Sequence, residues 1–563
     1  MADSRQMVGF PSPEQAHMWA EQFAGNKLDR ILYVIGFSDG QFIREMLNWF
    51  DETDMVVIYE PYEENFVYVS ERYDVSDILD DKRVTLYCGS ERLSDVFNDI
   101  SQNVTYERID RIQLVLVPGY AECKEILAKI KEAVEYQVRH VCIEKNTNYI
   151  LAQASRTNYM RNMPTIVKER SLRQLAVKFS QYELGGIPAI IIAAGPSLDR
   201  NIREIQRVQG HSFIIAVDTA LKAVLRAGIS PDIIVCIDPQ KELVLFEHEE
   251  IGGVPAIFGM DIPDSVTGRH TAPIFFTGNG QKDIMSSFCQ RYGKEPYPQL
   301  ATGGSVANTA FSAALLMGFR TVILVGQDLA YTDGRGHTGA AYDNEEKNTK
   351  DAANATQTCE VMGIYGDLVK TDRTMNVYRE WFEQQIVVNP EIKVIDATEG
   401  GALIKGSEVM TLRDAIDREC VKDFDAAGII NSIPPLFSEE EQEEIRQKLL
   451  SIDESLDELI KELSDGINAY RMLALAVKQN NQGLIAKSLE ALKAVNDIDN
   501  TNPLMSIVHM YCIREEYEAK DALKADDGSS VDAAVDNGIR LLEAYITGAE
   551  AMKQDTWQLK DRL

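Results

Sequence analysis

The sequence predicts a mixed α/β protein in which two regions of parallel sheet are followed by an all-helical C-terminal region. Three observations lead to this prediction. Short apolar runs alternate with segments of helical period up to about residue 430, a pattern typical of parallel strands covered by helices. Several of the later runs end in aspartate or glycine. Beyond Pro434 and Pro435 the strand-like runs stop, and apolar residues recur every three or four positions, as on one face of a helix.

The strands of the N-terminal region are predicted from four apolar runs. These runs begin at Ile31, Met55, Val84 and Ile112, and helical-period segments separate them. A helix-like stretch rich in Asn and Arg follows and is predicted to be a connector. We therefore assign residues 1–165 to an N-terminal Rossmann-like α/β domain that includes this connector.

The sequence leaves open whether this first domain binds a nucleotide. The turn from Gly36 to Gly40 follows the first run, and Glu60 follows the second. This arrangement resembles the glycine turn and the acidic residue of a nucleotide-binding half-domain. The turn has fewer glycines than the dinucleotide fingerprint requires, and Glu60 fits a simple turn cap equally well.

The central region is predicted to form a second parallel sheet. Its apolar runs occupy residues 188–193, 213–217, 233–237, 255–258, 273–277, 321–325 and 392–395. We assign residues 166–433 to this central catalytic domain and residues 434–563 to a helical bundle. Ligands bind beyond the carboxyl ends of parallel strands, so the residues that end the central runs are the candidate site.

Composition narrows the classes of function. The chain has 563 residues, 45% of them hydrophobic and 26% charged, and no apolar stretch is long enough to cross a bilayer. A net charge of −31 argues against a nucleic-acid or membrane-surface partner, because phosphate-rich surfaces require clustered Lys and Arg. The N-terminus lacks the pattern of a secretion signal, and the eight cysteines include no CxxC pair. These features predict a cytoplasmic protein with reduced thiols and no zinc site.

Two glycine-hinged turns are candidates for holding an anion. Gly195-Pro196-Ser197 follows the first central run, and Thr302-Gly303-Gly304-Ser305 precedes a helix-like segment that includes Asn308. Glycine permits close backbone approach, and free amides at a helix start bind phosphate or carboxylate. Neither turn matches the Walker A or GxGxxG pattern, so each is equally compatible with a purely structural turn.

The remaining candidates follow other central runs. They are Asp218 and Thr219, Asp238, Gln327 and Asp328, Tyr331, and Glu399 and Gly400. A single aspartate after a strand is commonly a cap or turn residue, but several in succession favour a polar rim that binds a ligand. His337 lies in the polar, glycine-rich loop after Asp328, where a histidine can act as a base near neutral pH. An ordinary exposed histidine remains the alternative.

Four segments of the central region, in their order along the chain, resemble those of a known family. The segments PAIIIAAGPSLDRNI, IIAVDTALKAVLRAGISPDIIVCID, TGGSVANTAFSAALLMGFRTVILVGQDLAYTDGRGHT and DATEGGALIKG lie within residues 150–410. They resemble the motility-associated factor (Maf) family of bacterial flagellin glycosyltransferases. The N-terminal α/β region and the helical tail also have the expected places.

This resemblance implies transfer of a nonulosonic acid, of the pseudaminic, legionaminic or sialic type, from a CMP-activated donor to Ser or Thr of flagellin. It also implies that the central domain is a Rossmann-type domain similar to bacterial sialyltransferases, a variant of the GT-A fold. Gly195, Pro196 and Ser197 would face the cytidine phosphate. Gly303, Gly304, Ser305 and Asn308 would line the opposite wall, and Thr302 and the other rim residues would complete the donor site.

The chemistry of such a donor assigns further roles. The anomeric bond breaks through an oxocarbenium-like state, so amides stabilise the leaving phosphate, carboxylates shield the cation, and His337 or Asp328 deprotonates the acceptor hydroxyl. A CMP leaving group requires less help from a metal than a diphosphate does. We therefore expect no required cofactor and no metal site, although the acidic rim leaves room for a divalent cation.

Two alternatives remain. The GPSL turn and the PD-x-x-x-x-x-D segment are also shared with an archaeal pterin diphosphokinase group, which implies phosphoryl transfer from ATP. A non-catalytic escort that binds flagellin through the helical tail is the other.

Overall fold

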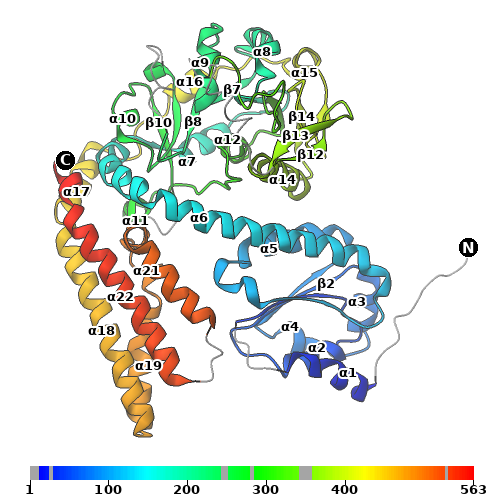
Figure 1. Ribbon diagram of the computed structural model, residues 1–563, viewed down its shortest axis with the longest axis vertical. Helices are drawn as coiled ribbons and strands as arrows, with labels where there is room; N and C mark the ends of the chain where they lie inside the picture. The colour runs from blue at the N-terminus through cyan, green and yellow to red at the C-terminus, as the bar shows by residue number, and fades with distance from the viewer. Residues whose placement is uncertain (1–11, 25–28, 242–250, 279–283, 342–357, 526–529) are drawn as a thin grey trace, which may run out of the picture. The chain divides into compact units, whose positions relative to one another are not determined.

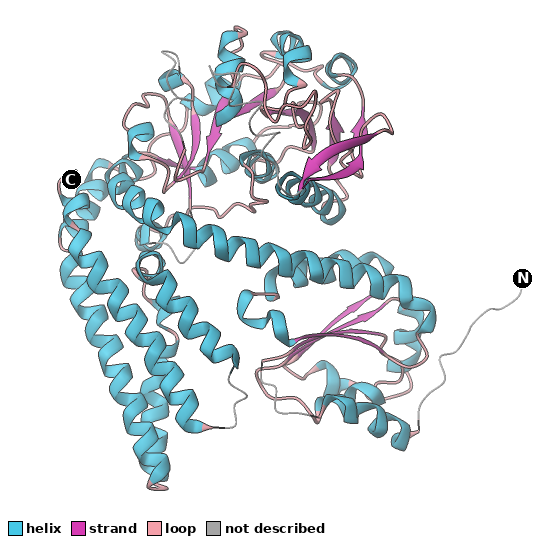
Figure 2. Ribbon diagram, viewed as in Figure 1, coloured by secondary structure: helices cyan, strands magenta, loops and turns pink. Residues whose placement is uncertain are grey.

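The computed structural model describes residues 12–24, 29–241, 251–278, 284–341, 358–525 and 530–563 (Figures 1 and 2). The chain forms two compact units. The first comprises Met1–Ile150, Gly466–Ala491 and Arg514–Ala544, and the second comprises Leu151–Asp465, Leu492–Ile513 and Tyr545–Leu563. Both units therefore contain segments of the C-terminal helices. The predicted domain boundaries at residues 166 and 434 stay predictions.

The first unit is built on a four-stranded parallel sheet of order β3-β2-β1-β4. Its strands are β1 (Ile31–Ile35), β2 (Met55–Glu60), β3 (Val84–Cys88) and β4 (Ile112–Leu116). Its N-terminal helices are α1 (Pro13–Ala20), α2 (Gln41–Leu47), α3 (Glu63–Ser70), α4 (Ser76–Leu79) and α5 (Leu93–Asn103). In Figure 1, α2 and α4 lie on one face of the sheet and α5 lies on the other. Every residue of β1 is buried, which is why this run lacks polar alternation.

The carboxylate of Glu60, at the end of β2, is hydrogen-bonded to other residues of this unit. Its carboxylate accepts hydrogen bonds from the amides of Phe37 and Tyr62, at 2.9 Å each, and from the hydroxyl of Tyr120. The Tyr120 ring fills the space beside Gly36, where a Cβ atom would lie 2.4 Å from the ring. Burial raises the pKa of Glu60, while the three hydrogen bonds lower it. These contacts join the loops after β1, β2 and β4, so Glu60 acts here as a structural link.

The second unit contains a nine-stranded sheet in which every pairing is parallel. The strand order is β15-β14-β11-β6-β7-β8-β9-β10-β5. The strands are β5 (Arg170–Ser171), β6 (Ala189–Ile192), β7 (Phe213–Val217), β8 (Ile233–Cys236), β9 (Ala256–Gly259), β10 (Ile274–Thr277), β11 (Thr321–Val325), β14 (Lys393–Asp396) and β15 (Glu408–Val409). Ile190 of β6 pairs with Ile323 of β11 on one side and with Ile214 of β7 on the other.

Helices cover both faces of this sheet, which explains its nearly continuous apolar strands. In Figure 1, α7, α12 and α14 lie on one face, and α8, α9 and α10 lie on the other. Their bounds are α7 (Leu172–Phe179), α8 (Leu198–Asn201), α9 (Asp218–Arg226), α10 (Asp264–Thr267), α12 (Val306–Leu316) and α14 (Arg373–Val388). The faces follow from the strand order, because right-handed crossovers in opposite directions place their helices on opposite sides.

The other elements are mainly helical. They are α6 (Lys124–Lys168), α11 (Ile284–Arg291), α15 (Leu412–Glu419), α16 (Ala426–Asn431), α17 (Glu439–Leu450), α18 (Ile452–Lys478), α19 (Gln482–Asn496), α20 (Ile498–Thr501), α21 (Met505–Ala525), α22 (Val531–Asp555) and α23 (Trp557–Lys560). An antiparallel hairpin pairs β12 (Thr358–Met362) with β13 (Leu368–Asp372). The predicted α/β class and the helical C-terminal region are confirmed. The hairpin, β5 and β15 were not predicted from the sequence.

Candidate active site

The candidate active site lies where the order of the strands reverses. From β6 the chain runs outward through β7, β8, β9 and β10 and then returns to β11 on the opposite side of β6. The loops after β6 and β11 therefore diverge, and open α/β sheets bind ligands in such a crevice. Gly195-Pro196-Ser197 lies in the loop after β6, and Gly326-Gln327-Asp328 follows β11.

Asp328 joins these two loops. Its carboxylate accepts hydrogen bonds from the Ser197 hydroxyl at 2.6 Å, from the Ser197 amide at 3.3 Å and from the Thr332 hydroxyl at 2.6 Å. Asp328 is 2% exposed. Burial raises its pKa, and the hydrogen bonds from Ser197 and Thr332 oppose that effect. The amide and hydroxyl of Ser197, which were expected to face the donor phosphate, are therefore engaged by Asp328 in this structure.

Two glycines allow the backbone to close around Asp328, and a third lies beside it. A Cβ atom at Gly195 would lie 2.0 Å from Oδ2 of Asp328, and one at Gly401 would lie 2.1 Å from its carbonyl oxygen. A Cβ atom at Gly400 would lie 3.5 Å from Oδ1 of the same side chain. Any larger residue at Gly195 or Gly401 would displace Asp328. Close packing on Asp328 therefore requires glycine at 195 and 401, whereas the distance at Gly400 is an ordinary contact.

Glu399 holds the loop that carries Gly400. Its Oε1 atom accepts hydrogen bonds from the Asn201 side chain at 3.1 Å and from the Leu412 amide at 3.0 Å. Its φ angle of 59° lies in the left-handed region, which is uncommon for a residue other than glycine. Glu399 thus links this loop to the end of α8 and the start of α15.

The loop that carries His337 is docked on the turn after β6. The Thr338 amide donates to the carbonyl of Ala194 at 2.7 Å, and the Thr338 hydroxyl donates to Asp199. Arg335 forms an ion pair with Asp199 at 2.9 Å. Because Thr338 follows it directly in the chain, His337 is held next to the Gly195 turn, and its side chain is half-buried.

Tyr331 is tied to the β12–β13 hairpin. Its hydroxyl donates to Asp372 at 2.5 Å, and its amide donates to the carbonyl of Lys370 at 2.8 Å. The Thr371 hydroxyl donates to the carbonyl of Leu329 at 2.8 Å. The hairpin therefore supports the segment that follows Asp328.

The second predicted turn caps α12. Ser305 is the N-cap residue: its hydroxyl accepts from the Asn308 amide, and the Asn308 side chain accepts from the Ser305 amide, both at 3.2 Å. This reciprocal pair is a capping box. It occupies the amides of Ser305 and Asn308, whereas Thr302 is exposed. A crossover helix runs antiparallel to the strands that it connects, so α12 begins at the same carboxyl edge as the Gly195 turn.

Aromatic side chains of α14 pack against the two glycines of this turn. A Cβ atom at Gly303 would lie 2.4 Å from the Trp381 ring, and one at Gly304 would lie 2.7 Å from the Tyr378 ring. Trp381 is 4% exposed. A larger residue at Gly303 or Gly304 would therefore clash with α14. Tyr378 and Trp381 form a wall at this side of the rim.

Asp218 begins α9 directly after β7. Its Oδ1 atom accepts from the Thr219 amide at 2.6 Å, from the Thr219 hydroxyl at 3.0 Å and from the Lys241 ammonium group at 2.8 Å. Asp218 is 1% exposed, and the Lys241 side chain is 11% exposed. Burial lowers the pKa of Lys241, but attraction to Asp218 outweighs burial and raises it. Asp238, after β8, is half-buried and accepts from the Gln240 amide at 2.9 Å.

Four side-chain oxygens at this edge are buried without a partner among the residues that the structure describes. They are Oδ1 of Asn201, Oδ2 of Asp218, Oε1 of Gln327 and Oδ2 of Asp396. Asp396 is the last residue of β14 and is fully buried. Burial raises its pKa to about 6, and the negative charge of Asp328 acts in the same direction. Buried polar atoms are nearly always hydrogen-bonded, so this concentration of exceptions indicates a place where a ligand supplies the partners.

The sequence prediction did not single out several residues of this rim. Lys241 has no local pattern that marks it as buried, because its partner Asp218 belongs to another strand end. Tyr378 and Trp381 recur at helical spacing, a signal that indicates a buried face but not which turn that face covers. Asp199 has no local pattern that marks it as a partner of Arg335 and Thr338, which lie more than 130 positions further along the chain.

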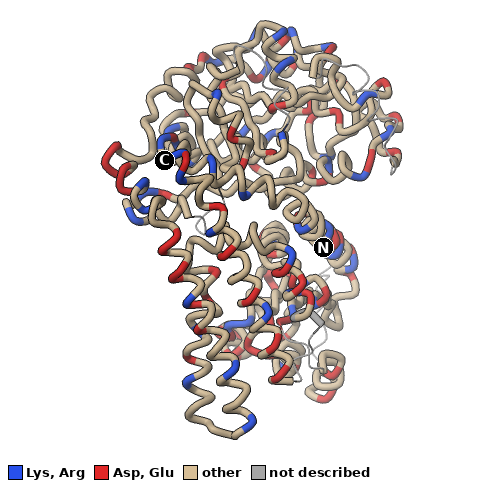
Figure 3. The backbone as a smooth tube through the Cα atoms, turned by 60° about the vertical axis from the view of Figure 1, so that its left-hand side comes forward, with Lys and Arg blue, Asp and Glu red and all other residues tan. Residues whose placement is uncertain are grey.

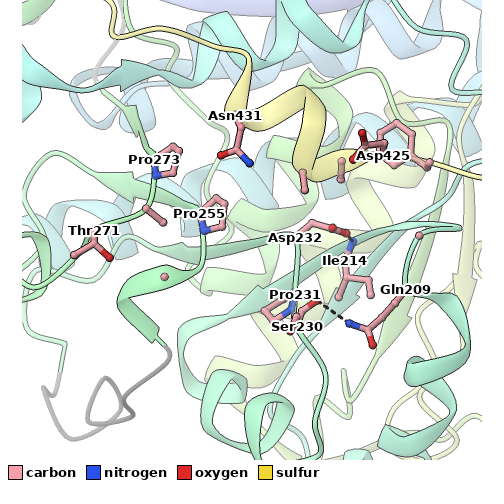
Figure 4. Close-up of a pocket in the computed structure, with 16 residues that line it drawn as sticks. Gln209, Ile214, Ser230, Pro231, Asp232, Pro255, Thr271, Pro273, Asp425 and Asn431 are labelled. Carbon is pink, nitrogen blue, oxygen red and sulfur yellow. Dashed lines mark hydrogen bonds between the residues drawn. The ribbon is translucent and has the colours of Figure 1, made fainter.

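A separate cavity lies at the opposite, amino edge of the same sheet (Figure 4). It has a volume of about 720 Å³ and is lined by residues that precede β7, β8, β9 and β10 and by the start of α16. Asp232 lies in this cavity, where its Oδ2 atom accepts from the Ile214 amide at 2.7 Å. Burial raises the pKa of Asp232 to about 7. None of the predicted site residues lines the cavity.

Replacing Asp232 with asparagine should stabilise the second unit at pH 8 but not at pH 4. The folded state binds the Asp232 proton more tightly than the unfolded chain does, so this residue's contribution to stability declines as the pH rises from about 4 to about 7. Asparagine keeps the acceptor for Ile214 and removes the charge. We expect a gain of about 1–3 kcal/mol at pH 8, measured by urea unfolding. Asp425→Asn, at the mouth of the cavity, is the matched control, and an equal gain at both pH values would contradict the prediction.

Two further features of the described residues concern metals and membranes. No group of three or more His, Cys, Asp or Glu side chains in this part of the chain is arranged to hold a metal ion. None of the helices described combines the length and the apolar character that a membrane span requires.

Comparisons with known proteins identify similar folds. A protein-family model described as 6-hydroxymethylpterin diphosphokinase MptE-like matches residues 157–334. The solved structure of the MAf glycosyltransferase from Magnetospirillum magneticum AMB-1 is similar over 99% of this chain and 89% of that one, with a TM-score of 0.50 at 15% identity. An uncharacterized protein of Treponema pallidum (strain Nichols) is 26% identical over 122 residues, which span 20% of this chain and 42% of that protein. The structural match extends through both units, and at this identity it establishes the fold alone.

Proposed function

We propose that the chain is a glycosyltransferase that moves a nonulosonic acid from a CMP-activated donor to Ser or Thr hydroxyls of flagellin. The observation that carries the proposal is that buried oxygens of Asp218, Gln327 and Asp396, around the switch point of the sheet, have no hydrogen-bond partner among the described residues. A nucleotide sugar brings many hydroxyl and amine donors that could satisfy them. The Maf-like motifs and the fold shared with a solved MAf glycosyltransferase support this choice.

The donor phosphate requires local binding, because the chain carries a net charge of −31. Figure 3 shows basic residues interspersed with acidic ones along the chain. The capping box takes the amides of Ser305 and Asn308, and Asp328 takes the amide of Ser197. The other amides in the first turn of α12, at the positive end of its dipole, are therefore the ones suited to hold an anion in such surroundings. This assignment uses no metal or resident cofactor.

The reaction proposed here breaks the bond between the anomeric carbon and the CMP phosphate. The electron pair leaves with the phosphate, and an acceptor hydroxyl forms the new bond to the anomeric carbon while it loses its proton. Carboxylates of the rim stabilise the oxocarbenium-like charge that develops between these events. Asp396, which is buried at the same edge and forms no ion pair with the residues that the structure describes, is the carboxylate proposed to supply this negative field.

His337 is the residue that receives the acceptor's proton in this scheme. Asp328, the other candidate, is 2% exposed, and both of its carboxylate oxygens accept hydrogen bonds from Ser197 or Thr332. Its position suits the support of the Gly195 turn better than contact with a protein substrate. His337 is half-buried in a loop held beside the same turn, where an acceptor could reach it.

Flagellin is the proposed protein partner, and the C-terminal helices are the proposed contact. The helical hairpin of α18 and α19 exposes apolar side chains: Met472 is 43% exposed, Leu475 is 52% exposed and Leu489 is 53% exposed. Exposed apolar side chains on adjacent helices are suited to pack against a helical partner. The proposed compartment is the cytoplasm, where flagellin is made.

Co-expression with flagellin and a CMP-nonulosonic acid pathway tests the function. We expect intact-mass analysis to show flagellin heavier by whole numbers of sugar residues, and purified protein to release CMP in the presence of donor and flagellin. Unmodified flagellin, together with a failure of the protein to bind CMP, would overturn the proposal. Flagellin that binds the protein but stays unmodified would favour the escort hypothesis.

Phosphoryl transfer is the second candidate, and the match of residues 157–334 to an MptE-like family model favours it. Such an enzyme would transfer diphosphate from ATP to a hydroxymethylpterin and release AMP. Incubation with ATP, Mg²⁺ and 6-hydroxymethylpterin separates the two candidates: AMP release supports the second, and CMP release from a CMP-sugar supports the first.

A further inference from the structure

The two oxygens of the Asp218 carboxylate differ in their hydrogen bonding. Oδ1 accepts three hydrogen bonds, two from Thr219 and one from Lys241. Oδ2 is buried and has no hydrogen-bond partner among the described residues. The Cys236 thiol lies beside this side chain, and burial followed by the Asp218 charge raises its pKa, but a thiol is a weak donor. A carboxylate oxygen that is buried in this way requires a strong donor from elsewhere.

The place of Asp218 in the fold suggests which donor that is. β6 carries the glycine turn of the switch point, β7 is the next strand in both the chain and the sheet, and Asp218 follows β7 directly. In dinucleotide-binding sheets, the acid at the end of the strand after the glycine turn accepts a hydrogen bond from a ribose hydroxyl. Glu60 occupies the comparable place in the first unit, but there the fold itself satisfies the carboxylate.

The charges around Asp218 favour a hydroxyl as the ligand group. The Lys241 ammonium group lies 2.8 Å from Oδ1, so the pair is neutral as a whole and gives no net attraction to a second cation. A phosphate oxygen carries no proton to donate and would be repelled by the carboxylate. A neutral hydroxyl donates to Oδ2 without either cost.

From these contacts we infer that a ribose hydroxyl of the nucleotide donor binds Oδ2 of Asp218, and that Lys241 is a positioning residue for this carboxylate. The inference rests on the proposed function, because it assumes that the donor is a ribonucleotide. Lys241 also donates to the Thr219 hydroxyl at 3.0 Å, so it holds Thr219 and Oδ1 of Asp218 together. The sugar of the nucleotide, rather than its base, is what this subsite recognises.

Binding of CMP, 2′-deoxy-CMP and 3′-deoxy-CMP to the full-length protein, measured by isothermal titration calorimetry, tests the inference. The wild-type protein should bind CMP about 10- to 100-fold more tightly than at least one of the deoxynucleotides, because a hydrogen bond to a charged group is lost. The same comparison of Kd values in variants then assigns the effect to Asp218.

Asp218→Asn should weaken CMP binding and reduce the ratio between CMP and the deoxynucleotide to below about threefold. Lys241→Met should reduce the ratio as well, because it leaves the carboxylate without its partner, and Lys241→Arg should restore part of it. Asp232→Asn, the same chemical change at the opposite edge of the sheet, should leave both the affinity and the ratio unchanged. The ratio is informative because a general loss of structure would weaken all three nucleotides alike.

Equal binding of all three nucleotides by the wild-type protein would overturn the inference and leave the proposed function standing. An unchanged ratio in Asp218→Asn would also overturn it. A ratio that falls in Asp218→Asn but not in Lys241→Met would remove the role of Lys241. Absence of CMP binding by the wild-type protein would overturn the proposed function and the inference together.

Discussion

Replacing Gly195 with alanine should abolish CMP binding and sugar transfer. The new Cβ atom would lie 2.0 Å from Oδ2 of Asp328 and 2.4 Å from the carbonyl oxygen of Gly326, distances that neither neighbour can accept without moving. The turn after β6 and the loop after β11 must then separate at the switch point. We expect CMP affinity to fall by about 100-fold or more and the second unit to lose about 1–3 kcal/mol of stability.

Calorimetry with CMP and urea unfolding measure the two effects separately. Gly253→Ala is the matched control, because its φ angle is not in the left-handed region and a Cβ atom there would meet nothing within 4 Å. If Gly195→Ala bound CMP as tightly as the wild-type protein, the donor would not lie at this turn. A change confined to unfolding would reduce the turn to a purely structural role.

Replacing His337 with glutamine should lower kcat for sugar transfer by about 10²- to 10⁴-fold, the usual contribution of a general base. Glutamine is polar and similar in length but cannot accept a proton near neutral pH. The KM for the donor should change little, because the role assigned to His337 concerns the acceptor hydroxyl. Steady-state rates with purified flagellin and a CMP-sugar measure both quantities.

Two companion variants sharpen this test. His211→Gln replaces a histidine before β7, at the amino edge of the sheet, where it pairs with Asp423, and should leave the rate unchanged. Asp328→Asn keeps an acceptor for Ser197 and can donate to the Thr332 hydroxyl, so its effect on kcat should be much smaller. A larger loss of kcat in Asp328→Asn than in His337→Gln would transfer the role of base to Asp328.

Much of the fold could be predicted from local pattern. The buried strands β6, β7, β8 and β11 appear in the sequence as uninterrupted apolar runs, because helices cover both faces of the sheet. The C-terminal helices were predicted from their three- and four-residue spacing. The strands β5 and β15 were missed, since each has only two residues and shows no period. The β12–β13 hairpin was missed because its strands are mostly exposed and lack an apolar run.

For the candidate site, the sequence predicted which residues lie at the edge of the sheet but not which of them contact one another. The rim residues could be predicted because the carboxyl ends of parallel strands meet at one edge, and the sequence shows which residues end each run. Their partners could not. Ser197 and Asp328 are 131 positions apart, and no local signal connects them. Gly195 and Gly400 were predicted to belong to the donor site, a prediction that stands, but no local signal showed that Gly195 and Gly401 pack against Asp328.

The sequence by itself determined the α/β class, the helical C-terminal region and the set of polar residues at one edge of the central sheet, because periodicity and turn chemistry are local properties of the chain. Only the tertiary structure decided which of these residues satisfy one another and which are left without a partner. Asp328 is enclosed by Ser197, Thr332 and the backbone at Gly401, whereas Asp218 keeps a buried oxygen that receives no hydrogen bond from any residue the structure describes. That difference depends on strand order, which brings together residues that are distant in the chain.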